Sequence, residues 1–152
     1  MVNTARHPAH NLLINTLFIV FIGLSCSAHA FDKGQMRLIG DRKSQMISIQ
    51  IARTQEDREQ GLMNRDTVAP YQGMLFDFGK EQQVTMWMKD TKIPLDMIFY
   101  DNQHEVKYLY QGTKPFSETW IPAPTPVHYV LELPAGDVKK YGIRIGDKFE
   151  LK

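Results

Sequence analysis

The stretch of the chain that concentrates the most chemistry runs from Met86 to Asp96 and reads Met-Trp-Met-Lys-Asp-Thr-Lys-Ile-Pro-Leu-Asp. In an extended segment the side chains alternate between two faces, so Met86 and Met88 share one face and Trp87 takes the other. Pro94 disfavours helix at the residue before it, so the polar residues between are expected in a turn. The sequence therefore predicts a polar turn at the end of a pair of strands, a common place for a binding site.

Charged residues from elsewhere in the chain are expected to complete a ligand-binding site at this turn. Arginine holds carboxylates, phosphates or sugar hydroxyls with paired N–H groups, whereas lysine offers a point charge. We expect a pocket for a small polar ligand or an envelope partner, with Trp87 and Met88 as its wall. Its expected polar lining is Arg53, Arg65, Lys89, Thr91, Asp96 and Glu132.

The same charged residues would have a purely structural role if they paired with one another. Lys89 would then pair with Asp96, and an arginine would pair with Glu132, to tie a helix to the sheet. Buried pairs of this kind specify an arrangement more than they add to the free energy of unfolding. A binding role instead requires an open hollow where these groups converge.

Methionine is frequent enough to raise a soft-metal alternative. Thioether sulfur prefers Cu(I) or Ag(I), and an indole face attracts cations. Core packing explains the same methionines, because this side chain fills irregular gaps. Beyond residue 30 only His104 and His128 could add nitrogen ligands, and neither is spaced with the methionines, so we expect no metal and no cofactor. The methionines concerned are Met63, Met74, Met86, Met88 and Met97.

Two further functions can be weighed from residue types. Aromatic side chains could stack against a sugar ring, although most aromatics in a small domain are core or loop anchors. Asp96 and Glu132 could act as the two carboxylates of a glycan hydrolase. The chain has no Gly-x-Ser-x-Gly elbow, no metal-hydrolase histidine pair and no phosphate-binding glycine loop, so enzymatic activity is not supported. The aromatic candidates are Trp87, Tyr100, Tyr108, Tyr110, Phe116 and Trp120.

Short alternating apolar segments must position these groups. Thr54 is expected to cap a helix over 54–60, with Asp57 at the capping-box position and Gly61 ending the helix. Phe116 and Trp120 are expected to pin a long proline-rich excursion over 111–127. The pattern contains no βαβ alternation and predicts a mainly β fold, a single small antiparallel barrel or sandwich with two short helices. Strands are predicted over 46–52, 73–78, 84–88, 95–100, 105–110, 128–133 and 148–152, and the second helix over 135–141.

The N-terminal residues have the pattern of a secretory signal peptide over 1–30. A basic start is followed by an apolar run from Leu12 to Leu24, which is short for a membrane span, and by Ala28-His29-Ala30. We expect cleavage near Ala30 and a periplasmic or secreted protein, with lipidation at Cys26 as the alternative. Residues 31–45 are expected to form a loose leader and residues 46–152 a single β domain.

Charge and cysteine content exclude several partners and linkages. The chain has 18 basic and 17 acidic residues, and Arg6 is the one Lys or Arg among the first thirty, so the remainder is neutral. Nucleic acid and anionic membrane surfaces require a basic excess, so neither is expected as a partner. No cysteine follows Cys26, which excludes disulfides in the folded part. The oligomeric state stays open.

Several separated motifs, in order, resemble the bacterial and archaeal family known as domain of unknown function 192. The resemblance covers nearly all of the chain beyond residue 30 and implies a compact, mainly β domain, frequently exported, with no established biochemical activity. Asp57 stands where that family usually has Glu, and Asp90 where it usually has Asn, which adds a charge beside Lys89. The motifs are Arg53-Thr54 with Arg58, Gly61-Leu62-Met63 with Arg65, Gly73-Met74-Leu75-Phe76, Trp87-Met88-Lys89 through Pro94-Leu95-Asp96, Tyr129-Val130-Leu131-Glu132 with Pro134-Ala135-Gly136, and Gly142-Ile143 with Gly146-Asp147.

Overall fold

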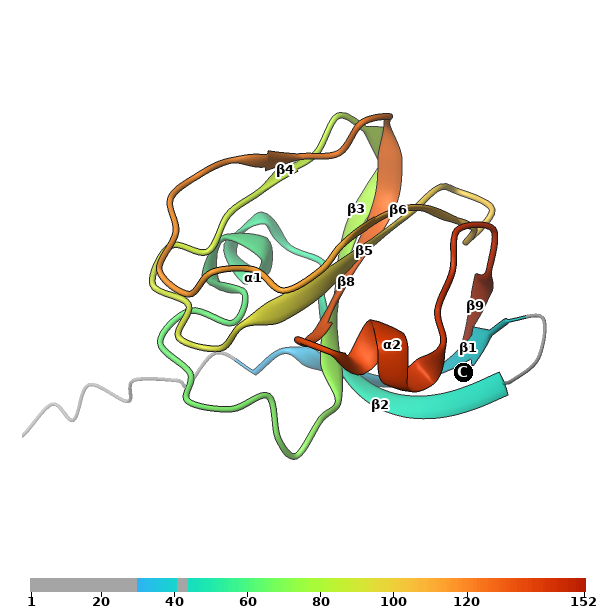
Figure 1. Ribbon diagram of the computed structural model, residues 1–152, viewed down its shortest axis with the longest axis horizontal. Helices are drawn as coiled ribbons and strands as arrows, with labels where there is room; N and C mark the ends of the chain where they lie inside the picture. Colours follow the sequence, from blue (N-terminus) through green and yellow to red (C-terminus); the bar gives the residue numbers. More distant parts are fainter. Residues whose placement is uncertain (1–29, 41–43) are drawn as a thin grey trace, which may run out of the picture.

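The computed structural model describes residues 30–40 and 44–152, which form nine strands and two short helices (Figure 1). The expected signal peptide and Cys26 lie outside the described residues, apart from Ala30. No helix among the described residues is long and apolar enough to cross a membrane. The elements are β1 Asp32–Ile39, β2 Ser44–Ala52, α1 Gln55–Gln60, β3 Gly73–Gln82, β4 Thr85–Met86, β5 Leu95–Tyr100, β6 Val106–Tyr110, β7 Ile121–Pro122, β8 Val127–Pro134, α2 Asp137–Tyr141 and β9 Lys148–Leu151.

Seven of the strands make one curled sheet in the order β6-β5-β8-β3-β2-β1-β9, and β4 pairs with β7 in a small ribbon. All pairs are antiparallel except β2 with β3. The two edges of the large sheet approach each other, because the Val106 N–H donates to the Asp147 carbonyl at 2.8 Å and the Phe149 N–H to the His104 carbonyl at 3.2 Å. The sheet is therefore curled toward a barrel, and the predicted mainly β class is confirmed.

The prediction of a loose leader over residues 31–45 is wrong for Asp32–Ile39, which forms β1 between β2 and the edge strand β9. Met36 and Leu38 alternate inward and are 0% and 5% exposed. Gly34 and the charged neighbours hide this alternation in the sequence, but β-pairing partners on both sides compensate for the weak local propensity. The folded unit thus begins before residue 46.

A second correction concerns the connection from β2 to β3, which is parallel and carries α1, so the fold contains one βαβ unit. The sequence does not predict it, because the helix is only six residues long and a long loop follows it. Its capping box is as predicted: the Thr54 hydroxyl accepts from the Asp57 N–H at 3.0 Å, and the Asp57 carboxylate accepts from the Thr54 N–H at 2.9 Å. Gly61 ends the helix.

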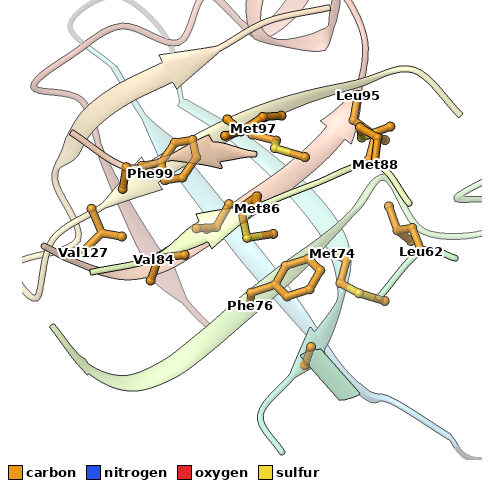
Figure 2. Close-up of a cluster of buried hydrophobic side chains, with 14 of the residues drawn as sticks. Leu62, Met74, Phe76, Val84, Met86, Met88, Leu95, Met97, Phe99 and Val127 are labelled. Atoms are coloured by element: carbon orange, nitrogen blue, oxygen red, sulfur yellow. The ribbon is translucent and has the colours of Figure 1, made fainter. Parts of the chain in front are cut away.

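The sheet has a hydrophobic core on each face. Leu75 of β3 belongs to the cluster on the face that also packs Val138 of α2, whereas Met74 and Phe76 belong to the cluster on the opposite face. Alternation of this kind is what the strand predicted over 73–78 requires. Figure 1 shows α1 and α2 on opposite sides of the central strands, and Figure 2 shows Met74, Phe76, Met86, Met97 and Phe99 pointing into a common interior on the α1 side.

The excursion over 111–127 is held by other residues than the predicted anchors. Phe116 and Trp120 are 60% and 73% exposed, so neither pins the loop. Thr113 does so instead: its hydroxyl accepts from the Leu95 N–H at 2.8 Å, and its own N–H donates to the Leu95 carbonyl at 2.9 Å. Ile121 packs into the core from β7, which pairs with β4. A small hydroxyl that bridges two backbone groups is not visible in a hydrophobicity pattern.

A close backbone approach at Gly73 generates a stability prediction. A Cβ added there would lie 2.5 Å from the Glu132 carbonyl oxygen, so β3 and β8 would have to separate. We expect Gly73→Ala to lower the free energy of unfolding by about 1–3 kcal/mol in chemical denaturation. Gly34→Ala is the matched control, since the close contact of its Cβ would be with the flexible end of Ile51, at 3.0 Å, and not with backbone. Equal stability of the two variants would contradict the tight packing of β3 on β8.

Candidate ligand-binding site

A cavity of about 340 Å³ lies between α1 with its following loop, β3, β4 and β8. Six apolar and seven polar side chains line it, so it can hold the apolar body of a small molecule and fix its orientation through polar groups. Three of the predicted site residues line it: Trp87 and Thr91 from the turn after β4, and Glu132 from β8. The apolar lining is Leu62, Met63, Phe76, Phe78, Met86 and Trp87, and the polar lining is Gln55, Arg58, Glu59, Gln60, Thr85, Thr91 and Glu132.

Glu132 is the most unusual of these groups. It lies on β8 directly opposite Met74 of β3 and Met97 of β5. Cross-strand partners share a face of the sheet, so the carboxyl group points into the same apolar layer as the two thioethers, both fully buried. Glu132 itself is 4% exposed. Within the described part of the chain, its carboxyl group makes no hydrogen bond and no ion pair.

Burial raises the pKa of the Glu132 carboxyl to about 8, because water is removed from the charged form and no cation replaces it. At neutral pH the group is therefore mostly a carboxylic acid, with one O–H donor and one carbonyl acceptor. Buried polar groups in proteins are nearly always hydrogen-bonded. An unpaired acid that borders a cavity is accordingly a place for the polar atom of a ligand.

The turn after β4 positions Trp87 and Thr91. Met88 is 1% exposed and anchors the turn beneath the surface, while Trp87 points outward and is 42% exposed, so the predicted two-sided arrangement is confirmed. The Met88 N–H donates to the Ser117 carbonyl at 2.9 Å, and the Thr91 hydroxyl donates to the Lys89 carbonyl at 3.0 Å. The Lys89 ammonium lies 5.3 Å from the centre of the Trp87 ring, outside the lining of the cavity.

The structure places Arg53 and Arg65 away from this cavity. Arg53 forms ion pairs with Asp32 and Asp77, which tie β1 to β3. Arg65 bonds the side-chain carbonyl of Gln50 and lies over the Phe31 ring at 4.9 Å. Arg65 borders a separate shallow hollow, so the two arginines and Glu132 do not converge.

Asp96 lies on the opposite face of the sheet from Glu132, because it is the cross-strand partner of Leu133, the next residue along β8. Its carboxylate accepts from three backbone N–H groups, those of Gly112 at 2.9 Å, Gly136 at 2.8 Å and Val138 at 3.0 Å. The expected Lys89–Asp96 pair is therefore wrong. Two carboxylates on opposite faces of a sheet cannot flank one glycosidic bond, so the arrangement required for the glycan hydrolase alternative is absent.

Arg58 is the cation in the cavity lining, and the sequence-based site did not include it. Its guanidinium donates to the Asp77 carbonyl at 2.9 Å and to the Arg53 carbonyl, and it lies over the Phe78 ring at 5.4 Å. These contacts hold α1 against β3. The spacing of Arg58 from Gly61 places it on the last turn of α1, but nothing in the sequence shows that this turn faces Phe78.

Four of the methionines weighed as soft-metal ligands share the buried cluster on the α1 side of the sheet (Figure 2). They pack among Phe76, Leu95 and Phe99, as core side chains do. Among the residues described, no three His, Cys, Asp or Glu side chains gather in a way that could hold a metal ion. The four methionines are Met74, Met86, Met88 and Met97.

The aromatic candidates divide between interior and surface. Tyr100 is 1% exposed, and Tyr108 is partly buried and packs against the core. Trp87 and Trp120 are exposed and border a second hollow of about 380 Å³ beside the β4–β7 ribbon. Trp87 thus stands between the two hollows.

Comparisons with known proteins place the chain among relatives. Residues 37–151 match the family described as domain of unknown function 192, Uncharacterized ACR. A solved structure of a candidate transcription regulator from Sinorhizobium meliloti 1021 is similar, with 41% identity, a TM-score of 0.79, and coverage of 82% of this chain and 97% of that one. A protein of unknown function from Novosphingobium aromaticivorans DSM 12444 is similar at 33% identity and a TM-score of 0.72, over 76% of this chain and 83% of that one. No curated protein matches.

The raised pKa of Glu132 predicts how stability depends on pH. The folded chain keeps this proton up to about pH 8, and the unfolded chain loses it near the ordinary value of 4.5, so folding takes up a proton between these limits. The contribution of Glu132 to stability is therefore full below pH 4.5 and falls as pH rises toward 8. We expect Glu132→Gln to gain stability relative to the wild type by roughly 1 kcal/mol per pH unit between about pH 5.5 and 7.5.

Urea denaturation of both proteins across this range measures the difference. Glu150→Gln is the control, because it removes an exposed carboxylate on β9. Parallel pH curves for the wild type and Glu132→Gln would show that Glu132 has an ordinary pKa.

Proposed function

The chain belongs to the domain of unknown function 192 family, and we propose that it is a binding module that holds a small, partly apolar ligand in the cavity beside Trp87. The observation that carries this proposal is the buried carboxyl group of Glu132, which borders an open cavity without a partner from the described residues. If residue 132 served only to pack the core, methionine or leucine would give a more stable protein, because a buried unpaired polar group costs about 1–3 kcal/mol.

The other lining residues would contact different parts of such a ligand. Phe76 and Met86 are buried, and together with the half-exposed Trp87 they offer apolar and aromatic surface to the body of the ligand. Thr91 is 5% exposed and its hydroxyl, which donates to Lys89, keeps lone pairs free to accept a hydrogen bond. The turn that carries Trp87 and Thr91 is tied to residues far along the chain at Ser117 and Asn64, which holds this wall in place.

We also propose that the protein acts in the periplasm or outside the cell, after cleavage near Ala30. The support is the basic start, the apolar run and the small-x-small tripeptide of residues 1–30. A neutral balance of charges beyond Ala30 fits a small ligand or an envelope protein better than a nucleic acid.

A soft monovalent metal is the second candidate ligand, and one observation favours it. Glu132 stands between Met74 and Met97 on adjacent strands, so a carboxylate and two thioethers share one face of the sheet, with Met86 in the same cluster. Soft sulfur donors select Cu(I) or Ag(I). A silver salt therefore belongs in any ligand screen of this protein.

A thermal-shift screen tests the proposed function. The compounds are amines, organic acids, sugars, cell-wall fragments and silver nitrate. A compound at 100 times its dissociation constant should stabilise the wild type by about 2.7 kcal/mol, and Trp87→Ala should lose most of this stabilisation. Trp120→Ala is the matched control, because Trp120 is also a surface tryptophan but does not line the cavity. Stabilisation that survives Trp87→Ala and is lost in Trp120→Ala, or no stabilisation by any class, would refute a ligand in this cavity.

A further inference from the structure

One ionisable side chain in the lining of the cavity lacks a partner. Three ionisable side chains line it: Arg58, Glu59 and Glu132. Arg58 donates to two backbone carbonyls, and Glu59 accepts from the Gln55 side chain at 2.7 Å. Only Glu132 is without a partner among the described residues, and its neighbours on β3 and β5 are the uncharged Met74 and Met97. The group that is missing from the cavity is therefore one that pairs with a carboxylate.

The wall beside Glu132 favours a cation over a neutral hydrogen-bond acceptor. Aromatic faces attract positive charge, and Phe76, Phe78 and Trp87 all contribute to the lining. The protein itself uses this attraction twice nearby, with Lys89 over Trp87 at 5.3 Å and Arg58 over Phe78 at 5.4 Å. The Thr91 hydroxyl adds an acceptor and no competing cation.

From this arrangement we propose that the ligand is an organic ammonium ion with an apolar substituent, and that Glu132 is its counter-ion. The inference rests on the proposed function, because it names the class of ligand for the same cavity. Its apolar substituent packs against Phe76, Met86 and Trp87, and its N–H groups donate to Glu132 and Thr91.

Binding of such a cation must release a proton. The empty site holds Glu132 mostly protonated at pH 7, because its pKa is about 8, and a cation beside it favours the carboxylate. The Glu132 proton then goes to the buffer, and an ammonium–carboxylate pair replaces the neutral acid. A neutral ligand that accepts from the acid would leave the proton in place. Proton release therefore separates the two kinds of ligand.

Three matched probes test the inference by calorimetry on the purified chain: benzylamine, benzyl alcohol and benzoate. They share one ring and differ in charge. At pH 7 we expect benzylamine to bind the wild type about tenfold more tightly than benzyl alcohol does, and benzoate to bind more weakly than both. Titrations in phosphate and in HEPES, which differ in ionisation enthalpy, should show release of about one proton per benzylamine bound. Glu132→Gln should lose both effects, and Glu150→Gln should keep them.

The outcomes that overturn the inference are distinct from those that overturn the proposed function. Equal binding of benzylamine and benzyl alcohol with no proton release would refute the cation and keep the cavity as a ligand site. Binding of none of the three probes would also refute the cation, whereas the Trp87→Ala screen decides separately whether the cavity binds anything. Should Glu132→Gln fail to fold, proton release by the wild type still decides, because that measurement needs no variant.

Discussion

A carboxyl group held in an apolar layer at the centre of the sheet is the constraint on which the site depends. β8 lies between β3 and β5, so the side chain of Glu132 has a strand on either side and its one opening is the cavity that it borders. The neighbours that the register gives it are Met74 and Met97. Such a group costs free energy unless it loses its charge or finds a partner. The structure allows both, because burial favours the neutral acid and a cavity leaves room for a partner.

The architecture separates this site from the residues that stabilise the fold. On the opposite face of the sheet, Asp96 accepts three backbone N–H groups and thereby fixes the turn at Gly136 and the start of α2. Successive residues along a strand point to opposite faces, and Asp96 pairs with Leu133, the residue after Glu132. The two buried carboxyl groups therefore have separate roles although they lie on neighbouring strands. Asp96 is fully satisfied by backbone donors, whereas Glu132 is not.

Local pattern in the sequence was sufficient for the mainly β class, for the capping box of α1 and for the opposite faces of Met88 and Trp87. It was insufficient wherever distant partners decide the outcome. β1 was missed because its pairing with β2 and β9 compensates for a weak apolar pattern. For the site, residue type correctly identified Trp87, Thr91 and Glu132 as cavity-lining residues. The register of β5 against β8 places Asp96 on the other face of the sheet. Ion pairs with Asp32 and Asp77 hold Arg53 away from the cavity. Arg58 lines the cavity because tertiary packing places α1 beside Phe78, which local sequence pattern does not show.

The proposed site requires that the Glu132 carboxyl group is mostly protonated at neutral pH in the ligand-free protein. A site-resolved titration measures this protonation state most directly. Side-chain carboxyl carbons of isotope-labelled protein can be followed by NMR from pH 4 to 9, with Glu132→Gln identifying the resonance. We expect a titration midpoint near 8, because burial disfavours the charged carboxylate. A midpoint between 4 and 5, the range of an ordinary glutamate, would show that the carboxyl group is hydrated or paired, and the site would lose its physical basis.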